Sequence, residues 1–316
     1  MTTTTHSQNS VTSTNKSTPK VGLIGLGAMG NGMAQSLRRA GHSPYVFDIR
    51  ADVSAAFAKD GGTACKSLTE LGGSCDVIVS VVVNAAQTES VLFGDNAGNS
   101  GCAATMKPGS VFVMCSTVDP NWSVALEAKL AAMNILYIDA PISGGAAKAA
   151  SGQMTMMTAG KPEAYAIAEP LLNAMAAKVY KLGDSAGAGS KVKIINQLLA
   201  GVHIAAAAEA MALGLREGVD PNALYEVITN SAGNSWMFEN RMAHVLAADY
   251  TPLSAVDIFV KDLGIVLDMA RATKFPLPLS STAHQMFMQA STAGFAKEDD
   301  SAVIKIFPGI ELPKKK

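Results

Sequence analysis

The chain has 316 residues, and its 48% of hydrophobic residues against 16% of charged ones is enough to build the cores of two domains. Its 25 lysines and arginines are balanced by 26 aspartates and glutamates, so the formal net charge of −1 excludes the basic surface that a nucleic-acid partner requires and favours a small-molecule ligand. The four cysteines lie far apart, which gives neither the paired spacing of a zinc site nor a disulfide framework, and we expect reduced, buried thiols and no bound metal.

The N-terminal segment and the longest apolar stretch indicate where in the cell the protein is located. Residues 1–19 have neither the apolar core of a secretory signal nor the arginines of a transit peptide, and we interpret them as a disordered tail. The longest apolar stretch, 200–215, contains His203 and Glu209 and is short for a bilayer span. We therefore predict a cytoplasmic protein without a membrane partner.

Short β-branched runs alternate with helix-like segments from residue 20 to about residue 183. They are continuous in apolar residues, which is typical of parallel strands covered by helices on both faces, and they lie at 21–26, 44–49, 76–83, 110–116 and 135–141. The segment 152–160 is expected to be a further strand whose methionines face the core. The pattern predicts a doubly wound α/β domain over residues 20–184.

The pattern changes after Gly183, where alanine-rich and leucine-rich helical segments follow. Gly218 is expected to close one helix, and Asp220 followed by Pro221 is typical of the N-cap and first position of the next. We therefore predict an all-helical domain over residues 185–316.

Residues 21–50 carry the spacing of a dinucleotide-binding turn. Gly25 permits a tight turn, Gly27 the close approach of a pyrophosphate, and Gly30 the contact of helix and strand. A second strand ends at Asp48, eighteen residues after Gly30, where a carboxylate can bind ribose hydroxyls and repel a 2′-phosphate. This motif predicts NAD as the cofactor, held by Asp48 and by the turn residues Gly25, Leu26, Gly27, Ala28, Met29 and Gly30.

An alternative to this cofactor prediction stays open. Glycines at this spacing also occur in ordinary turns, where Asp48 would only cap a strand. Arg50, two residues after the acidic side chain, could instead hold the additional phosphate of NADP.

The segment that follows Pro141 has the composition of an anion-binding loop. Proline forces extended backbone before it, and Ser143 is followed by Gly144 and Gly145. A hydroxyl beside successive backbone N–H groups suits a carboxylate ligand. Taken alone, Ser-Gly-Gly is more often a loop than a binding site.

Two lysines separated by one valine begin a predicted helix near Ser190. At 3.6 residues per turn the side chains of Lys191 and Lys193 are about 200° apart, so they cannot serve the same site. Lys191 is expected to reach solvent, whereas Lys193 shares its face with Asn196 and Gln197. The pattern makes Lys193 either a catalytic residue or a structural lysine with satisfied partners.

Four segments of the chain resemble, in their order, those of the β-hydroxyacid dehydrogenase family, which includes 3-hydroxyisobutyrate dehydrogenase, tartronate semialdehyde reductase and, more distantly, 6-phosphogluconate dehydrogenase. The segments are GLGAMGNGMAQSLRRAGH, DAPISGGAAKAASGQMTMMTAG, GAGSKVKIINQ and FVKDLGIVL, and the resemblance covers residues 20–308. It implies a Rossmann-type doubly wound domain followed by an all-α C-terminal domain, and assembly into homodimers or homotetramers.

The resemblance also implies roles for single residues. The loop Ser143, Gly144 and Gly145 would bind the substrate carboxylate, and the essential lysine of the family falls on Lys193. We hypothesise that Lys193 accepts the hydroxyl proton while hydride leaves the carbon for C4 of the nicotinamide, which requires a lowered pKa. Many relatives carry asparagine four residues after this lysine, where this chain has Gln197, so either Gln197 or Asn196 could orient the substrate hydroxyl.

Three further positions are expected near the cofactor. Thr117 matches a residue on the nicotinamide ribose side, Lys261 matches a lysine close to the cofactor, and Asn84 follows the strand at 76–83. Without the resemblance, Thr117 would be interpreted as a helix cap and Lys261 as a surface charge paired with Asp262.

The C-terminal segments AGNSWMFENRM, YTPLSAVDIFVKDLG and KEDDSAVIKIF look most like the branch of the family that oxidises the 2-hydroxyl of the four-carbon sugar acid L-threonate. Within them Trp236 and Phe238 are candidates to close the substrate pocket. The predicted function is NAD-dependent oxidation of a small hydroxy acid. The alternatives are a semialdehyde reductase, a 3-hydroxyisobutyrate-type dehydrogenase and a dinucleotide-binding module without catalysis.

Overall fold

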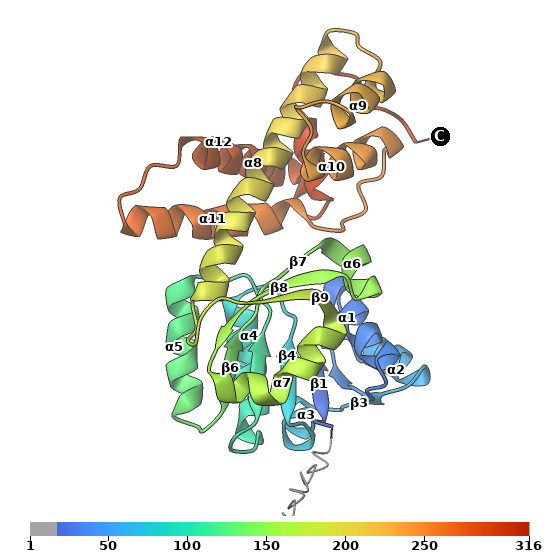
Figure 1. The fold of residues 1–316 in the computed structure, drawn as a ribbon. Helices are drawn as coiled ribbons and strands as arrows, with labels where there is room; N and C mark the ends of the chain where they lie inside the picture. Colours follow the sequence, from blue (N-terminus) through green and yellow to red (C-terminus); the bar gives the residue numbers. More distant parts are fainter. Residues whose placement is uncertain (1–17, 316) are drawn as a thin grey trace, which may run out of the picture.

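The computed structural model describes residues 18–315, so the tail predicted over 1–19 lies almost entirely outside the described residues. The chain forms a sheet-containing domain and a helical domain, joined by the long helix α8 (Ala188–Arg216), as Figure 1 shows. This is the predicted fold class, a Rossmann-like domain followed by an all-helical one.

In the described residues, nine strands form one sheet in the order β3-β2-β1-β4-β5-β6-β8-β7, with β9 also paired to β8. The strands from β1 to β6 are parallel, whereas β8 is antiparallel to β6 and β7. Their bounds are β1 Val21–Ile24, β2 Tyr45–Phe47, β3 Thr63–Ala64, β4 Val77–Ser80, β5 Val111–Met114, β6 Leu136–Asp139, β7 Ile142–Ser143, β8 Met154–Gly160 and β9 Ala176–Lys181.

The sequence prediction of strands holds where a strand is buried on both faces. Each of the five apolar runs contains a parallel strand, and the methionines of β8 are buried as expected. The sequence did not indicate β9, because its side chains are mostly exposed and include Lys178 and Lys181. The antiparallel pairing of β8 was also not predicted.

Helices cover both faces of the sheet and form two separate cores. On β5, Val111 and Val113 face one core, while Phe112 and Met114 face the other. The first core is completed by α1 (Ala28–Arg39) and α7 (Pro162–Met175), and α6 (Gly145–Ser151) packs on α1. The second is completed by α3 (Leu68–Ser74), α4 (Ala85–Phe93) and α5 (Pro120–Ala131), and α2 (Ala51–Lys59) flanks β2 and β3.

The helical domain is built around α8, which packs against α10 (Trp236–Ala247), α11 (Val256–Ala272) and α12 (Pro278–Ala290). A π-helical turn at Ser291–Phe295 and a 3-10 helix at Asp300–Ile306 complete it. The predicted cap is confirmed, because the Asp220 carboxylate accepts a hydrogen bond of 2.8 Å from the Ala223 N–H at the start of α9 (Pro221–Thr229).

The length and composition of α8 would allow it to cross a membrane, since its most apolar window has a mean hydropathy of 1.7. However, 44% of that window is buried inside the protein. Gly201 lets α11 approach closely, because a methyl group there would lie 3.0 Å from the side chains of Phe259 and Leu263. These contacts are those of a core helix.

The start of α8 is tied to the end of β6 by Asp139. This buried carboxylate accepts hydrogen bonds from the backbone N–H groups of Gly187 and Ser190, both at 2.9 Å, and from the Ser190 hydroxyl at 2.7 Å. A negative group at a helix N-terminus satisfies donors that have no partner within the helix. We propose that the domain boundary lies in the connection between β9 and α8, at about residues 184 and 185.

Candidate active site between the two domains

The glycine-rich turn connects β1 to α1. Gly25 has a φ of +91°, which favours glycine, and a methyl group on Gly30 would lie 1.8 Å from the carbonyl oxygen of Gly25. A methyl group on Gly27, by contrast, would meet no atom within 4 Å. The turn therefore closes tightly on the protein side while Gly27 faces open space, which is the arrangement that admits a pyrophosphate at the N-terminus of α1.

Asp48 lies beyond this turn at the end of β2. One carboxylate oxygen accepts a hydrogen bond of 2.7 Å from the Leu26 N–H, and the other accepts from the Arg50 N–H at 2.9 Å. Burial acts to raise the pKa of Asp48, but the hydrogen bonds from Arg50 and Leu26 outweigh it and lower the pKa. The ionised carboxylate is therefore fixed against the turn, where it suits ribose hydroxyls, and the Arg50 side chain is paired with it at 3.1 Å.

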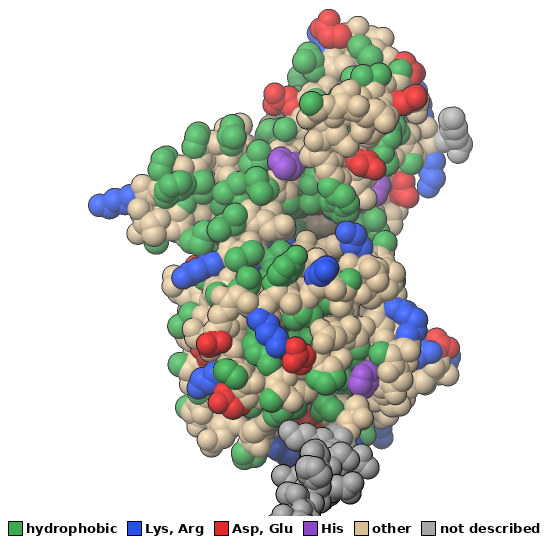
Figure 2. Space-filling model, in the orientation of Figure 1, with side chains coloured by type: hydrophobic (Ala, Val, Ile, Leu, Met, Phe, Trp, Pro, Cys, Tyr) green, Lys and Arg blue, Asp and Glu red, His purple; other side chains and the backbone are tan. Residues whose placement is uncertain are grey.

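A cavity of about 630 Å³ lies between the two domains, and the space-filling view in Figure 2 is hollowed where they meet. Its walls include turn residues Gly27 to Gly30, the end of β5 and the loop at Ser143, all from the sheet domain. The helical domain contributes residues of α8, α10 and α11. An open glycine turn, a nearby ionised carboxylate and a cavity of this size fit a dinucleotide such as NAD.

The candidate residues do not all line this cavity. Those that do are Gly27, Ala28, Met29, Gly30, Thr117, Ser143, Gly144, Gly145, Lys193, Asn196, Gln197 and Lys261. Gly25 and Leu26, in the first part of the turn, and Asp48, which contacts Leu26, are not among the lining residues. Asn84 is not among the lining residues either, because its side chain caps α4 by accepting a 2.8 Å hydrogen bond from the Gln87 N–H.

Lys193 is buried with only 7% of its surface exposed, whereas Lys191 is exposed, so the two lysines take different faces as predicted. The Lys193 amine donates to Gln197 Oε1 at 2.7 Å, and Gln197 Nε2 donates to Asp262 Oδ2 at 2.5 Å. Burial lowers the pKa of Lys193 to about 8; the charge of Asp262 acts to raise it and that of Lys261 to lower it further. A buried amine with this pKa can exchange a proton near neutral pH.

Lys261 connects the domains above the end of β5. Its amine donates to the backbone carbonyl of Thr117 at 3.1 Å and to the Asp262 carboxylate. Lys261 is partly buried rather than a fully exposed surface charge, since only 23% of its side chain is exposed, and its pairing with Asp262 is confirmed. Thr117 does not cap a helix, because Asp119 caps α5 by accepting from the Asn121 N–H at 2.7 Å.

The loop at the end of β7 presents backbone groups to the cavity. Gly144 and Gly145 have φ values of +134° and +75°, conformations that residues with side chains rarely adopt. Ser143 precedes them and also lines the cavity. The loop therefore offers a hydroxyl and unobstructed backbone to a small polar ligand.

The sequence indicated only part of the wall formed by α10. Trp236 lines the cavity as expected, but Phe238 does not: it is buried in the helical core with its ring 6.1 Å from that of Tyr225. Asn240 and Arg241 line the cavity and were not recognised as candidates. His203 and Glu209 are exposed.

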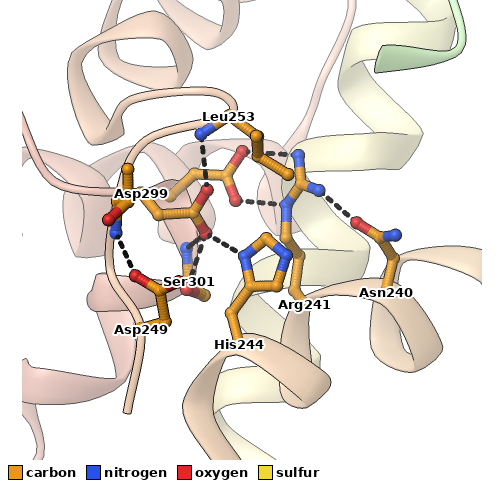
Figure 3. A network of polar contacts seen from close by, with 9 residues as sticks. Asn240, Arg241, His244, Asp249, Leu253, Asp299 and Ser301 are labelled. Atoms are coloured by element: carbon orange, nitrogen blue, oxygen red, sulfur yellow. Dashed lines mark hydrogen bonds and ion pairs between the residues drawn. The ribbon is translucent and has the colours of Figure 1, made fainter. Parts of the chain in front are cut away.

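Arg241 begins a buried polar network behind this wall, shown in Figure 3. Its guanidinium is paired with both carboxylate oxygens of Asp300, and it donates to the side-chain oxygen of Asn240. The neighbouring Asp299 accepts from His244 Nδ1 at 3.0 Å. Except for His244, these residues lie in the segments 232–242 and 297–307, whose sequences resemble one branch of the family. The sequence alone could not show that side chains from these two distant segments contact each other.

Comparison with known proteins agrees with this geometry. Residues 20–183 match the model described as the NAD binding domain of 6-phosphogluconate dehydrogenase, and residues 187–307 match that described as NAD-binding of NADP-dependent 3-hydroxyisobutyrate dehydrogenase. An L-threonate dehydrogenase of Cupriavidus necator is 67% identical over 295 residues, 93% of this chain and 98% of the relative, and one of Escherichia coli K12 is 51% identical over 294 residues, 93% and 96%. The crystal structure of a 3-hydroxyisobutyrate dehydrogenase from Salmonella typhimurium superposes with a TM-score of 0.87 at 54% identity, covering 91% of this chain and 99% of that one.

Proposed function

Because this chain belongs to the 3-hydroxyisobutyrate dehydrogenase family of NAD-dependent hydroxyacid dehydrogenases, we propose that it oxidises L-threonate at the 2-hydroxyl with Lys193 as the general base. The observation that carries the proposal is the place of Lys193, buried in the cavity that the glycine-rich turn and the Ser143 loop share. The names of the relatives at 67% and 51% identity support the choice of acid.

Different residues of the cavity bind the substrate carboxylate, remove the hydroxyl proton and hold the hydride acceptor. The Ser143 hydroxyl and the backbone of Gly144 and Gly145 bind the substrate carboxylate. This orients the neighbouring hydroxyl toward the Lys193 amine, which removes its proton. NAD, when bound by the turn and Asp48, supplies the hydride acceptor.

Gln197 and Asn196 have different tasks in this proposal. The Gln197 amide oxygen accepts a hydrogen bond from the Lys193 amine, and the amide nitrogen donates one to Asp262. Gln197 therefore positions the base. Asn196 donates one amide hydrogen to Gln197 at 3.1 Å and retains its other hydrogen and its oxygen. We therefore assign contact with the substrate hydroxyl to Asn196 and positioning of Lys193 to Gln197.

The substrate proposal is tested by initial rates of NADH formation with L-threonate, D-erythronate, D-glycerate and 3-hydroxyisobutyrate. L-Threonate should give the highest kcat/KM. Higher kcat/KM on another acid would contradict the choice of substrate but not the family. A parallel measurement of the reverse reaction with semialdehydes and NADH tests the reductase alternative.

We also propose a cytoplasmic protein that forms homodimers or homotetramers. The four cysteines are free and buried, which suits a reducing compartment. Val192, Ile195 and Leu199 are 40%, 54% and 51% exposed on one face of α8, and a second copy of the chain would cover them. Light scattering on the purified protein measures the oligomeric state directly.

A further inference from the structure

The cavity has a polar wall on α10 that the proposed reaction does not yet use. The Ser143 loop and Lys193 account for the carboxylate and for carbon 2 of a hydroxy acid. Asn240 and Arg241 line the same cavity from the helical domain. This wall is therefore available to the part of the substrate beyond the reacting carbon.

The orientation of the Asn240 amide is fixed by chemistry. Arginine has donors and no acceptor, so the atom of Asn240 that contacts the Arg241 guanidinium must be its oxygen. The amide nitrogen then points away from Arg241, as Figure 3 shows, and it has no hydrogen-bond partner within residues 18–315. Asn240 consequently presents two N–H donors on a wall of the cavity.

Arg241 is itself held rigidly. Arg241 is only 8% exposed, and its guanidinium forms two hydrogen bonds with Asp300, which is completely buried. The Asp300 N–H donates to the carbonyl of Ser254 at 2.7 Å, and the Leu253 N–H donates to Asp299 at 3.1 Å, so the loop that lines the cavity beside α10 belongs to the same network. Replacing a buried ion pair by apolar residues often costs no stability, so stability alone does not explain why this pair is here.

We propose that Asn240 binds a hydroxyl of the substrate beyond carbon 2, and that Arg241, held by Asp300, is the positioning residue that aims the Asn240 amide. This inference rests on the proposed function, and it identifies the preferred substrates as polyhydroxylated acids rather than acids with an alkyl chain. When the substrate fills the cavity, a donor left without a partner disfavours a substrate that lacks this hydroxyl.

The test compares L-threonate with 2-hydroxybutanoate of the same configuration at carbon 2, which lacks the other two hydroxyls. The measured quantity is the ratio of kcat/KM for the two acids. Asn240→Ala should lower this ratio by about 2- to 10-fold, mainly through the KM for L-threonate, because it removes one neutral hydrogen bond to the substrate. Glu239→Ala, an exposed neighbour that does not line the cavity, should leave the ratio unchanged.

The positioning role of Arg241 needs a double variant. Arg241→Lys keeps the charge beside Asp300 but loses the fixed fork, so it should lower the ratio as well. In the Asn240→Ala background the same change should have no further effect on the ratio. Thermal unfolding checks that each variant is folded. If Arg241→Lys lowers the ratio equally in the wild-type and Asn240→Ala backgrounds, the positioning role of Arg241 is overturned.

The outcomes separate this inference from the proposed function. Wild type that turns over neither acid would overturn both. Wild type that prefers L-threonate, together with an Asn240→Ala variant that keeps the full preference, would overturn the role of Asn240 and leave the proposed reaction intact.

Discussion

The Lys193 amine and the Asp262 carboxylate are connected through a single side chain, the amide of Gln197. Because a carboxylate only accepts, Gln197 must donate its nitrogen to Asp262 and turn its oxygen to Lys193. The orientation of the candidate base is therefore set by a residue on α11, while its pKa is set by burial together with the opposing charges of Asp262 and Lys261.

This arrangement predicts the pH dependence of the reaction. Oxidation requires the neutral amine, so kcat/KM should rise with pH and level off above the Lys193 pKa of about 8. Asp262 raises this pKa, so Asp262→Asn should move the rise to lower pH. Asp268→Asn, an exposed change on the same helix, serves as the control. An identical pH profile for Asp262→Asn would contradict the assignment of the rise to Lys193.

The glycine turn predicts two distinct effects of adding a methyl group. Gly30→Ala brings a methyl group against the Gly25 carbonyl and should destabilise the protein by about 1–3 kcal/mol, the usual cost of overpacking. Gly27→Ala meets no atom and should leave thermal stability unchanged, yet it should weaken NAD binding because the methyl group enters the space for the pyrophosphate. Differential scanning calorimetry measures the change in stability, and titration calorimetry measures the affinity for NAD. Equal NAD affinity in Gly27→Ala and wild type would contradict the location of the cofactor.

Asp48 should determine the preference for NAD. Asp48→Ala removes the carboxylate that repels a 2′-phosphate and frees Arg50 to bind it, so the ratio of NAD to NADP affinity should fall. Titration of each cofactor by fluorescence gives the ratio. Asp60→Ala changes an exposed carboxylate after α2 and should not alter it. If Asp48→Ala has the same preference as wild type, Asp48 does not contact the ribose.

His244 and Asp299 should make part of the stability pH-dependent. The hydrogen bond to Asp299 raises the pKa of His244, so the folded state holds the imidazolium more tightly than the unfolded state. Its contribution, about 1 kcal/mol for a partly exposed pair, is complete below the unfolded pKa and is lost as pH rises through the folded value. The difference in unfolding free energy between wild type and His244→Gln should therefore shrink from pH 5 to about pH 8. Urea titrations at the two pH values measure it, and a constant difference would contradict the ion pair.

The sequence was sufficient where one local pattern determines the structure. The buried strands, the helix that follows Gly183 and the opposite faces of Lys191 and Lys193 depend on periodicity and capping within a few residues. The roles of Gly25 and Gly30 in the turn likewise depend on backbone conformation and close approach, which glycine spacing indicates.

The sequence was insufficient where distant segments meet. Asp262 and Gln197, or Arg241 and Asp300, become partners only when helices of the second domain pack together. Phe238 was expected, like Trp236, to close the pocket. In a helix, residues two positions apart point to different faces, and Phe238 packs in the core.

The most direct test of the proposed mechanism compares wild type, Lys193→Ala and Lys191→Ala in NADH formation from L-threonate, with NAD binding measured on each. General-base catalysis contributes about 10²- to 10⁴-fold, so Lys193→Ala should lose at least the lower of these factors in kcat while binding NAD almost as wild type does. Lys191→Ala, a change of the exposed lysine on the same helix, should retain full turnover. Full turnover by Lys193→Ala would contradict the assignment of Lys193 as the base.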